Sequence, residues 1–268
     1  MPELLLWWHS VQNVMTPAQW GWGIAAALMV GMSKTGVPGL GILVVNLLVL
    51  GFGGWESVGL MLPMLIFGDL FAVVWYKRHA DWKMLARLLP WVLGGLAIGF
   101  VALKFIGQND QTKLWMNPII GSLVLLMLVF HLLEKKLGSW LTGKSGAGLT
   151  GVAAGFTTTV SNAAGPIMSI FLTAQRFPKE QFMGTIAWYF FTINLTKVPL
   201  FILQDDMLTL GTLKIAASLF PAILIGAFAG KWLFTRIPQA LFTGTILALA
   251  GIGAAHLVID NLLKLLRP

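Results

Sequence analysis

Two stretches of this chain place polar residues inside apolar surroundings. In the first, residues 29–43, Lys34 lies between Ser33 and Thr35. The second, residues 151–169, contains a series of small polar side chains: Thr157, Thr158, Thr159, Ser161 and Asn162. An ammonium group together with hydroxyl and amide donors can hold an anion through charge-assisted hydrogen bonds. The chemistry indicated by these residues is therefore anion binding.

The same two stretches contain residues that interrupt helices. Pro38 lacks a backbone donor and has glycines around it, and a Gly165-Pro166 pair occurs in the second stretch. We predict half-helices at residues 19–32 and 38–52 with an unwound loop between them, and a similar break before Pro166. At membrane depth, irregular backbone is tolerated only where it is buried in protein or lines a wet cavity.

Half-helices that begin near Pro38 and Pro166 would direct free N–H groups and positive dipole ends into the protein interior, where they can bind an anion. The predicted substrate-binding residues are Ser33, Lys34, Thr35, Gly36, Gly39, Thr157, Thr158, Thr159, Ser161, Asn162 and Gly165. An intramembrane charge is a functional candidate by default. The alternative for Lys34 is that its ammonium group extends to the membrane surface.

Three further polar residues, which we predict to form a coupling or ion-pair group, lie inside apolar runs: Asp69, Asn194 and Lys197. A buried carboxylate needs a partner, and the candidates for Asp69 are Lys34 and Lys197. The resulting ion pair is either purely structural or exchanges a proton or a partner during transport. Lys197 would instead extend to the membrane surface if it lay near a helix end.

Other chemistries have little support in this sequence. There are no cysteines, which excludes disulfides and thiolate metal sites, and the four histidines lack the spacing of a metal site. Residues 36–41 share glycines with a phosphate-binding loop but lack its Gly-Lys-Ser/Thr ending. An intramembrane enzyme would need a catalytic set that is not evident here. We therefore expect no metal, no cofactor and no enzymatic activity.

The two interruptions belong to an internal duplication. Three pairs share a spacing of 124 positions: Gly31 and Gly155, Gly41 and Gly165, and Glu56 and Glu180. Three more pairs share a spacing of 131 positions: Pro90 and Pro221, Gly95 and Gly226, and Gly99 and Gly230. We predict that residues 18–134 form the first repeat and residues 146–259 the second.

The composition is that of an integral membrane protein. Hydrophobic residues make up 57% of the chain and charged residues 10%, and the mean hydropathy is +0.82, whereas soluble domains carry about 25% charged residues. Six apolar runs have about the 20 residues that a spanning helix needs: residues 57–76, 84–106, 115–133, 181–203, 212–234 and 238–259. The predicted fold class is an all-α integral membrane protein, with residues 1–268 in a single membrane domain.

Each repeat is predicted to hold one broken helix pair and three transmembrane helices. If both broken pairs are re-entrant, one side of the membrane collects 11 lysines and arginines and the other side 5; if each pair crosses once, the split is 10 to 6. The positive-inside rule slightly favours the re-entrant arrangement and explains the net charge of +8 without nucleic acid. Three crossings per repeat give the halves opposite orientations, related by an inverted pseudo-two-fold axis.

The stretches GMSKTGVPGLGILVVNLL and GLTGVAAGFTTTVSNAAGPIMSIFL resemble the TauE/SafE family of sulfite and organosulfonate exporters. The resemblance extends over residues 20–259. Members of that family typically carry a GxGGG-like first break, whereas Lys34 and Thr35 occupy that break here, with Gly39 and Gly41 beyond it. This departure indicates a different anion preference. The resemblance implies movement of small anions such as sulfite, sulfoacetate or thiosulfate, usually outward.

We therefore expect a secondary transporter that moves small anions across the cytoplasmic (inner) membrane by alternating access around the two breaks. The alternatives are a passive anion channel, or an importer of thiosulfate or small organic acids. The expected partners are the small anionic substrate, the lipid bilayer and protons. Small-residue faces suit tight helix packing, within one protomer or in a homo-oligomer: Gly94, Gly95, Gly99, Gly226 and Gly230.

Overall fold

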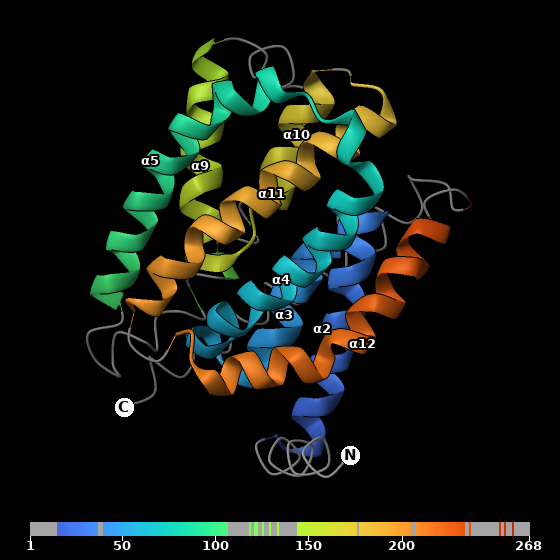
Figure 1. Cartoon of the computed structure of the whole chain (residues 1–268). Coiled ribbons are helices and arrows are strands. Elements are labelled where there is room, and N and C mark those ends of the chain that lie inside the picture. The colour runs from blue at the N-terminus through green and yellow to red at the C-terminus, as the bar shows by residue number, and fades with distance from the viewer. Residues whose placement is uncertain are drawn as a thin grey trace.

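The computed structural model of the chain describes residues 15–36, 40–106, 144–175, 177–204 and 207–233, with isolated positions beyond them (Figure 1). Over these residues the chain is helical, without strands, as the predicted all-α class requires. The elements are α2 (Pro17–Thr35), α3 (Gly41–Phe52), α4 (Gly54–Tyr76), η2 (Lys77–His79), α5 (Trp82–Ile106), α9 (Lys144–Ser161), α10 (Gly165–Ala174), α11 (Lys179–Ile202) and α12 (Leu210–Leu233).

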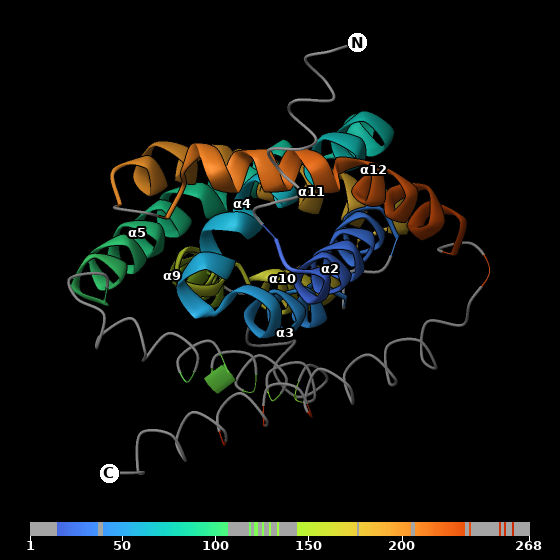
Figure 2. The same cartoon turned by 90° about the horizontal axis from the view of Figure 1, so that it is seen from below.

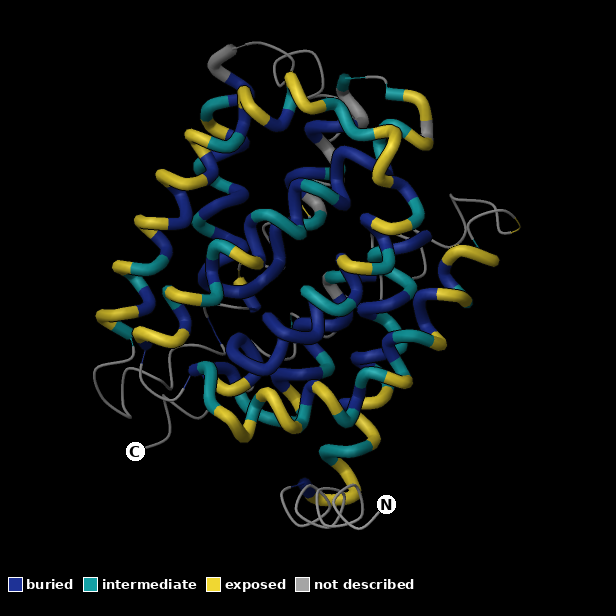
Figure 3. The backbone as a smooth tube through the Cα atoms, viewed as in Figure 1, coloured by how far each residue is buried: buried dark blue, intermediate teal, exposed yellow. Residues whose placement is uncertain are grey.

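Four helical segments are long and apolar enough to cross a membrane: Gly54–His79, Trp82–Ile106, Glu180–Ile202 and Leu210–Leu233. Each agrees with a run predicted from the sequence to within three residues at either end. The other two predicted runs, at 115–133 and 238–259, fall almost entirely outside the described residues. Figure 3 shows exposed positions along the outer edges of α5 and α12, and many of them are large apolar side chains, as a lipid-facing surface requires.

The first break lies between α2 and α3. Helix α2 begins at a capping box, in which Thr16 Oγ1 accepts a hydrogen bond from the Gln19 backbone N–H at 3.2 Å, and Pro17 follows the cap. The helix continues to Thr35, three residues beyond the predicted end, so Lys34 lies in its last helical turn rather than in an unwound loop. Methionine and lysine favour helix, and the Tyr76 hydroxyl, from α4, donates to the Thr35 carbonyl in the last turn, so α2 continues until Gly36.

The second break lies between α9 and α10. Helix α9 ends at Ser161, and Asn162 has a left-handed φ of 54°, which asparagine tolerates better than most residues. Helix α10 begins at Gly165, as predicted, but Thr157 lies within α9 rather than in an unwound loop. Figure 2 shows α2 and α3 side by side, and Figure 1 shows α10 returning toward the end of the molecule where α9 begins. The re-entrant and inverted interpretation of these pairs stays a prediction.

The two halves pack reciprocally through glycine contacts. Helix α5 lies along α9, and α12 lies along α2. A methyl group at Gly95 of α5 would overlap the carbonyl oxygen of Val152 in α9, and one at Gly226 of α12 would overlap that of Leu28 in α2. Gly95 and Gly226 are related by the 131-residue spacing, and Leu28 and Val152 by the 124-residue spacing. The contacts of one half therefore recur in the other, which supports the predicted duplication.

Glycines of α9 and α2 make equivalent close contacts with the backbones of α5 and α12. A methyl group at Gly155 would overlap the carbonyl oxygen of Val92, and one at Gly31 would overlap that of Ile223. We refer to these two helix contacts, α5 with α9 and α12 with α2, as the glycine seams. Gly94, in contrast, has open space where a Cβ would lie.

The adjacent glycines of α5 give a matched test of the seams. We expect Gly95→Ala to lower the thermal unfolding temperature in detergent, because overpacking of this kind costs about 1–3 kcal/mol. Gly94→Ala should leave the temperature unchanged or raise it slightly, since alanine favours helix and its methyl group meets no neighbour. Equal unfolding temperatures for the two variants would contradict the close approach of α5 and α9.

Candidate functional site

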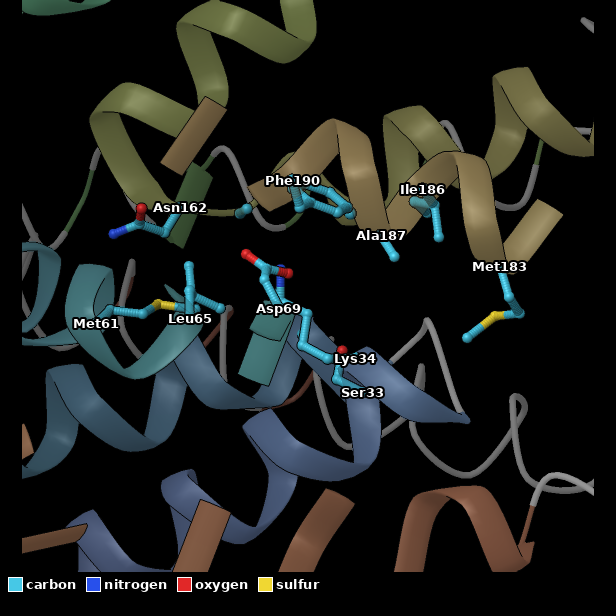
Figure 4. Close-up of a pocket in the computed structure, with 13 residues that line it drawn as sticks. Ser33, Lys34, Met61, Leu65, Asp69, Asn162, Met183, Ile186, Ala187 and Phe190 are labelled. Atoms are coloured by element: carbon cyan, nitrogen blue, oxygen red, sulfur yellow. The ribbon is translucent and has the colours of Figure 1, made fainter. Parts of the chain in front are cut away.

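Both helix breaks contribute to one cavity in the interior of the protein (Figure 4). It is formed by the end of α2, the start of α3, the second break, the start of α10, and the facing sides of α4 and α11. The lining residues are Ser33, Lys34, Gly41, Met61, Leu65, Asp69, Asn162, Ala163, Gly165, Met183, Ile186, Ala187 and Phe190. Its volume of about 40 Å³ has room for roughly three water-sized groups, which is close to the size of a small oxyanion.

The cavity contains a buried ion pair. Lys34 Nζ lies 2.7 Å from Asp69 Oδ1, and the Asn194 side-chain amide donates to Asp69 Oδ2 at 2.6 Å. The Asp69 side chain is fully buried and that of Lys34 is 10% exposed. Of the two lysines considered from the sequence, the partner of Asp69 is Lys34. Figure 4 shows the Lys34 side chain extending toward Asp69 in the cavity, where it is almost completely buried.

Two aromatic side chains contact the end of α2, one at Lys34 and one at Thr35. The Lys34 ammonium nitrogen lies 4.0 Å from the centre of the Phe190 ring, which is cation–π geometry. The Tyr76 hydroxyl donates to the Thr35 carbonyl at 2.8 Å, which satisfies one of the carbonyl groups left free at the end of α2. Neither contact was predicted, because an aromatic residue in an apolar helix carries no signal of its partner.

Lys197 is fully buried in α11 and contacts the second break. Its ammonium nitrogen donates to the Thr158 carbonyl at 3.0 Å, to the Thr158 hydroxyl at 3.2 Å and to Asn162 Oδ1 at 2.5 Å. The Asn162 amide in turn donates to the Val58 carbonyl at 2.9 Å. The alternative that Lys197 extends to a membrane surface is therefore wrong, since the charge sits at the carbonyl end of α9.

The first residues of α3 and α10, Gly41 and Gly165, both line the cavity. The first backbone N–H groups of a helix have no partner within it and carry the positive end of the helix dipole. The N-terminal ends of two helices, with the positive ends of their dipoles, therefore face the same space as Lys34, which is an arrangement that favours an anion.

Several predicted binding residues lie next to the cavity without lining it. The Thr35 hydroxyl donates to the Ala227 carbonyl at 2.7 Å and so faces α12. A methyl group at Gly36 would overlap the backbone of Gly230, so Gly36 is also part of the seam between α2 and α12. Gly39 lies outside the described residues.

The hydroxyl groups of α9 are directed mostly to its own backbone. Thr159 donates to the Gly155 carbonyl at 2.8 Å, and Ser161 donates to the Thr157 carbonyl at 3.0 Å. Such bonds are common for hydroxyl residues inside helices. Among the described residues, no three histidine, aspartate or glutamate side chains lie close enough together to hold a metal ion.

The sequence model described as sulfite exporter TauE/SafE matches residues 23–257 of this chain. The chain belongs to the sulfite exporter TauE/SafE family. No curated protein and no solved structure gave a match. The resemblance inferred from the two glycine-rich stretches is thereby confirmed, and with its apolar helices this TauE/SafE protein is a multi-pass membrane protein of a transporter family.

The apolar lining of the TauE/SafE cavity was not predicted, although helical spacing would have indicated it. Met61 and Leu65 precede Asp69 by eight and four positions, so the three side chains share one face of α4. Ile186 and Phe190 precede Asn194 in the same way on α11. The apolar wall could therefore have been predicted from the residues four and eight positions before each buried polar residue, which lie on the same helix face.

A double-mutant cycle tests the ion pair. Lys34→Gln or Asp69→Asn alone should destabilise the protein by about 3–5 kcal/mol, because each leaves an unpaired buried charge. The double variant should lose much less than the sum, since both charges are removed. Thermal unfolding in detergent measures all four proteins. Additive losses would show that the two charges do not interact.

Proposed function

We propose that this protein is a secondary transporter that exports small anions across the cytoplasmic membrane, with sulfite and related sulfur oxyanions or organosulfonates as the substrate class. The observation that carries the proposal is the convergence of both helix breaks on one cavity containing Lys34 and two helix N-termini. Paired broken helices at corresponding positions of two repeats are the best sequence pointer to a transporter's binding site. Membership of the TauE/SafE family supports the same class of substrate.

In the proposed complex the anion lies between the helix starts and the end of α2. The first N–H groups of α3 and α10 and the Ser33 hydroxyl donate hydrogen bonds, and Lys34 supplies charge. The carboxylate of Asp69 already contacts Lys34, so the anion shares that ammonium group with it. Asp69 is the acid among the lining residues, so a proton carried with the substrate would bind there.

Alternating access is proposed to follow from movement of the broken helices around this cavity. The cavity lies between the ends of α2 and α9, which belong to different glycine seams, so a change in the relative position of the two seam pairs would open it to one side and close it to the other. With the cell interior negative, an anion that leaves gains about 2.3 kcal/mol per charge per 100 mV. Export would then be downhill without a coupling ion.

Flux measurements in liposomes test this proposal. We expect Lys34→Gln to reduce efflux of radiolabelled sulfite by tenfold or more, since roughly 1.4 kcal/mol of lost binding is already tenfold. Ser33→Ala, which removes a hydroxyl from the cavity without a charge, should reduce it by a smaller factor. Counterflow of labelled substrate in the wild type would identify a carrier rather than a channel.

Lys104→Gln is the matched control, because Lys104 is an exposed cation in the last turn of α5. Its sulfite efflux should equal that of the wild type. Efflux unchanged in Lys34→Gln, with the protein folded, would remove the centre of the proposed function.

A further inference from the structure

In the interior of the described structure, the positive charges outnumber the negative charges. The charged residues there are Lys34 at the end of α2, Asp69 in the middle of α4 and Lys197 in α11. Two ammonium groups therefore face one carboxylate, which leaves one positive charge. The other charged residues of the described spans are exposed near helix ends: Glu56, Lys77, Arg78, Lys83, Arg87, Lys104, Glu180, Lys214 and Lys231.

The uncompensated charge belongs to Lys197. An ammonium group has three N–H donors, and those of Lys197 meet three oxygens, which are the carbonyl and hydroxyl of Thr158 and the side-chain carbonyl of Asn162. All three acceptors are neutral groups, and Asp69, the one buried carboxylate among the described residues, is paired with Lys34. The dipole at the carbonyl end of α9 offsets only about half a charge.

This charge lies directly behind the cavity wall. Asn162 accepts a hydrogen bond from Lys197 and is itself a lining residue of the cavity. In a low-dielectric interior the attraction between charges at this range is much stronger than in water. An anion in the cavity would therefore be attracted electrostatically by Lys197, with only the Asn162 side chain between them.

A comparison of the two halves of the chain explains why two lysines but one aspartate are buried. At the 124-residue spacing, Lys34 corresponds to Thr158, and Lys197 contacts Thr158. The ends of α2 and α9 thus each have one lysine. At α2 it is Lys34, from the last turn of the helix itself, and at α9 it is Lys197, from α11. Asp69 corresponds to Ile193, so the equivalent position of the second half has no acid.

We propose that Lys197 is the charge-selecting residue of the anion site, and that the site takes a monoanion while the Lys34–Asp69 pair stays intact. The inference rests on the proposed function and narrows its substrate class. One negative charge in the cavity balances the interior, whereas a dianion would leave one negative charge in excess.

Methanesulfonate and sulfate test this inference, because they are both tetrahedral and similar in size but carry one and two negative charges. Their binding to the detergent-solubilised full chain is measured by calorimetry, with sulfite as a reference ligand. We expect the wild type to bind methanesulfonate about tenfold or more tightly than sulfate, and Lys197→Met to weaken methanesulfonate binding by a similar factor. Asp69→Asn, which adds one positive charge to the interior, should reverse the preference toward sulfate.

Lys214→Gln is the matched control, because it removes an exposed cation from α12 and should leave both affinities unchanged. Lys197→Gln is measured beside Lys197→Met, so that a folding defect in one variant does not decide the result. The inference is overturned if either folded Lys197 variant binds methanesulfonate like the wild type, or if Asp69→Asn keeps the original preference. A wild type that binds no anion, sulfite included, would overturn the proposed function itself.

Discussion

Two helices of this protein end inside an apolar body, and the polar groups at those ends constrain the rest of the structure. A helix end leaves carbonyl groups without partners, and at membrane depth no water is present to satisfy them. At the end of α2, the Tyr76 hydroxyl meets this need by donating to the Thr35 carbonyl. At the end of α9, Lys197 does so from a neighbouring helix. Lys197, a cation beside the cavity, is thus also a group that satisfies a carbonyl where α9 ends.

The ends of α2 and α9 meet this need with different residues. A lysine in the first half required an acid, and Asp69 supplies it with Asn194 holding its second oxygen. In the second half a threonine hydroxyl and carbonyl receive the lysine, so no acid is needed. A fully symmetric duplicate would have either balanced or doubled the charge. Instead, Lys34 is paired with a carboxylate in the cavity, whereas Lys197 is bonded to the neutral side chain of the lining residue Asn162.

Much of this arrangement could be predicted from the sequence because it rests on rare residues. Charges are costly inside apolar runs, so Lys34, Asp69 and Lys197 could be recognised without a structure, and so could the pairing of Asp69 with a lysine. Hydropathy located the four described spans, and proline and glycine located both breaks. The seam glycines could be recognised from their repeated spacing.

The remaining features depend on tertiary contacts that one sequence does not encode locally. Helix α2 continues through Lys34 because its neighbours favour helix and because Tyr76, distant in sequence, satisfies the last turn. The contact of Phe190 with Lys34 depends on how α11 crosses α2. Similarly, Thr35 and Gly36 were expected in the binding loop but face α12, since the seam of that helix extends to the end of α2.

The glycine seams also determine which parts of the protein can move as rigid bodies. At each seam one backbone touches another with no flexible side chain between them, so the two helices cannot slide without overlap. Helix α5 is therefore fastened to α9, and α12 to α2, although each pair joins opposite halves of the chain. Any rigid-body movement of these helices would therefore carry segments of both halves of the chain together, α5 with α9 and α12 with α2.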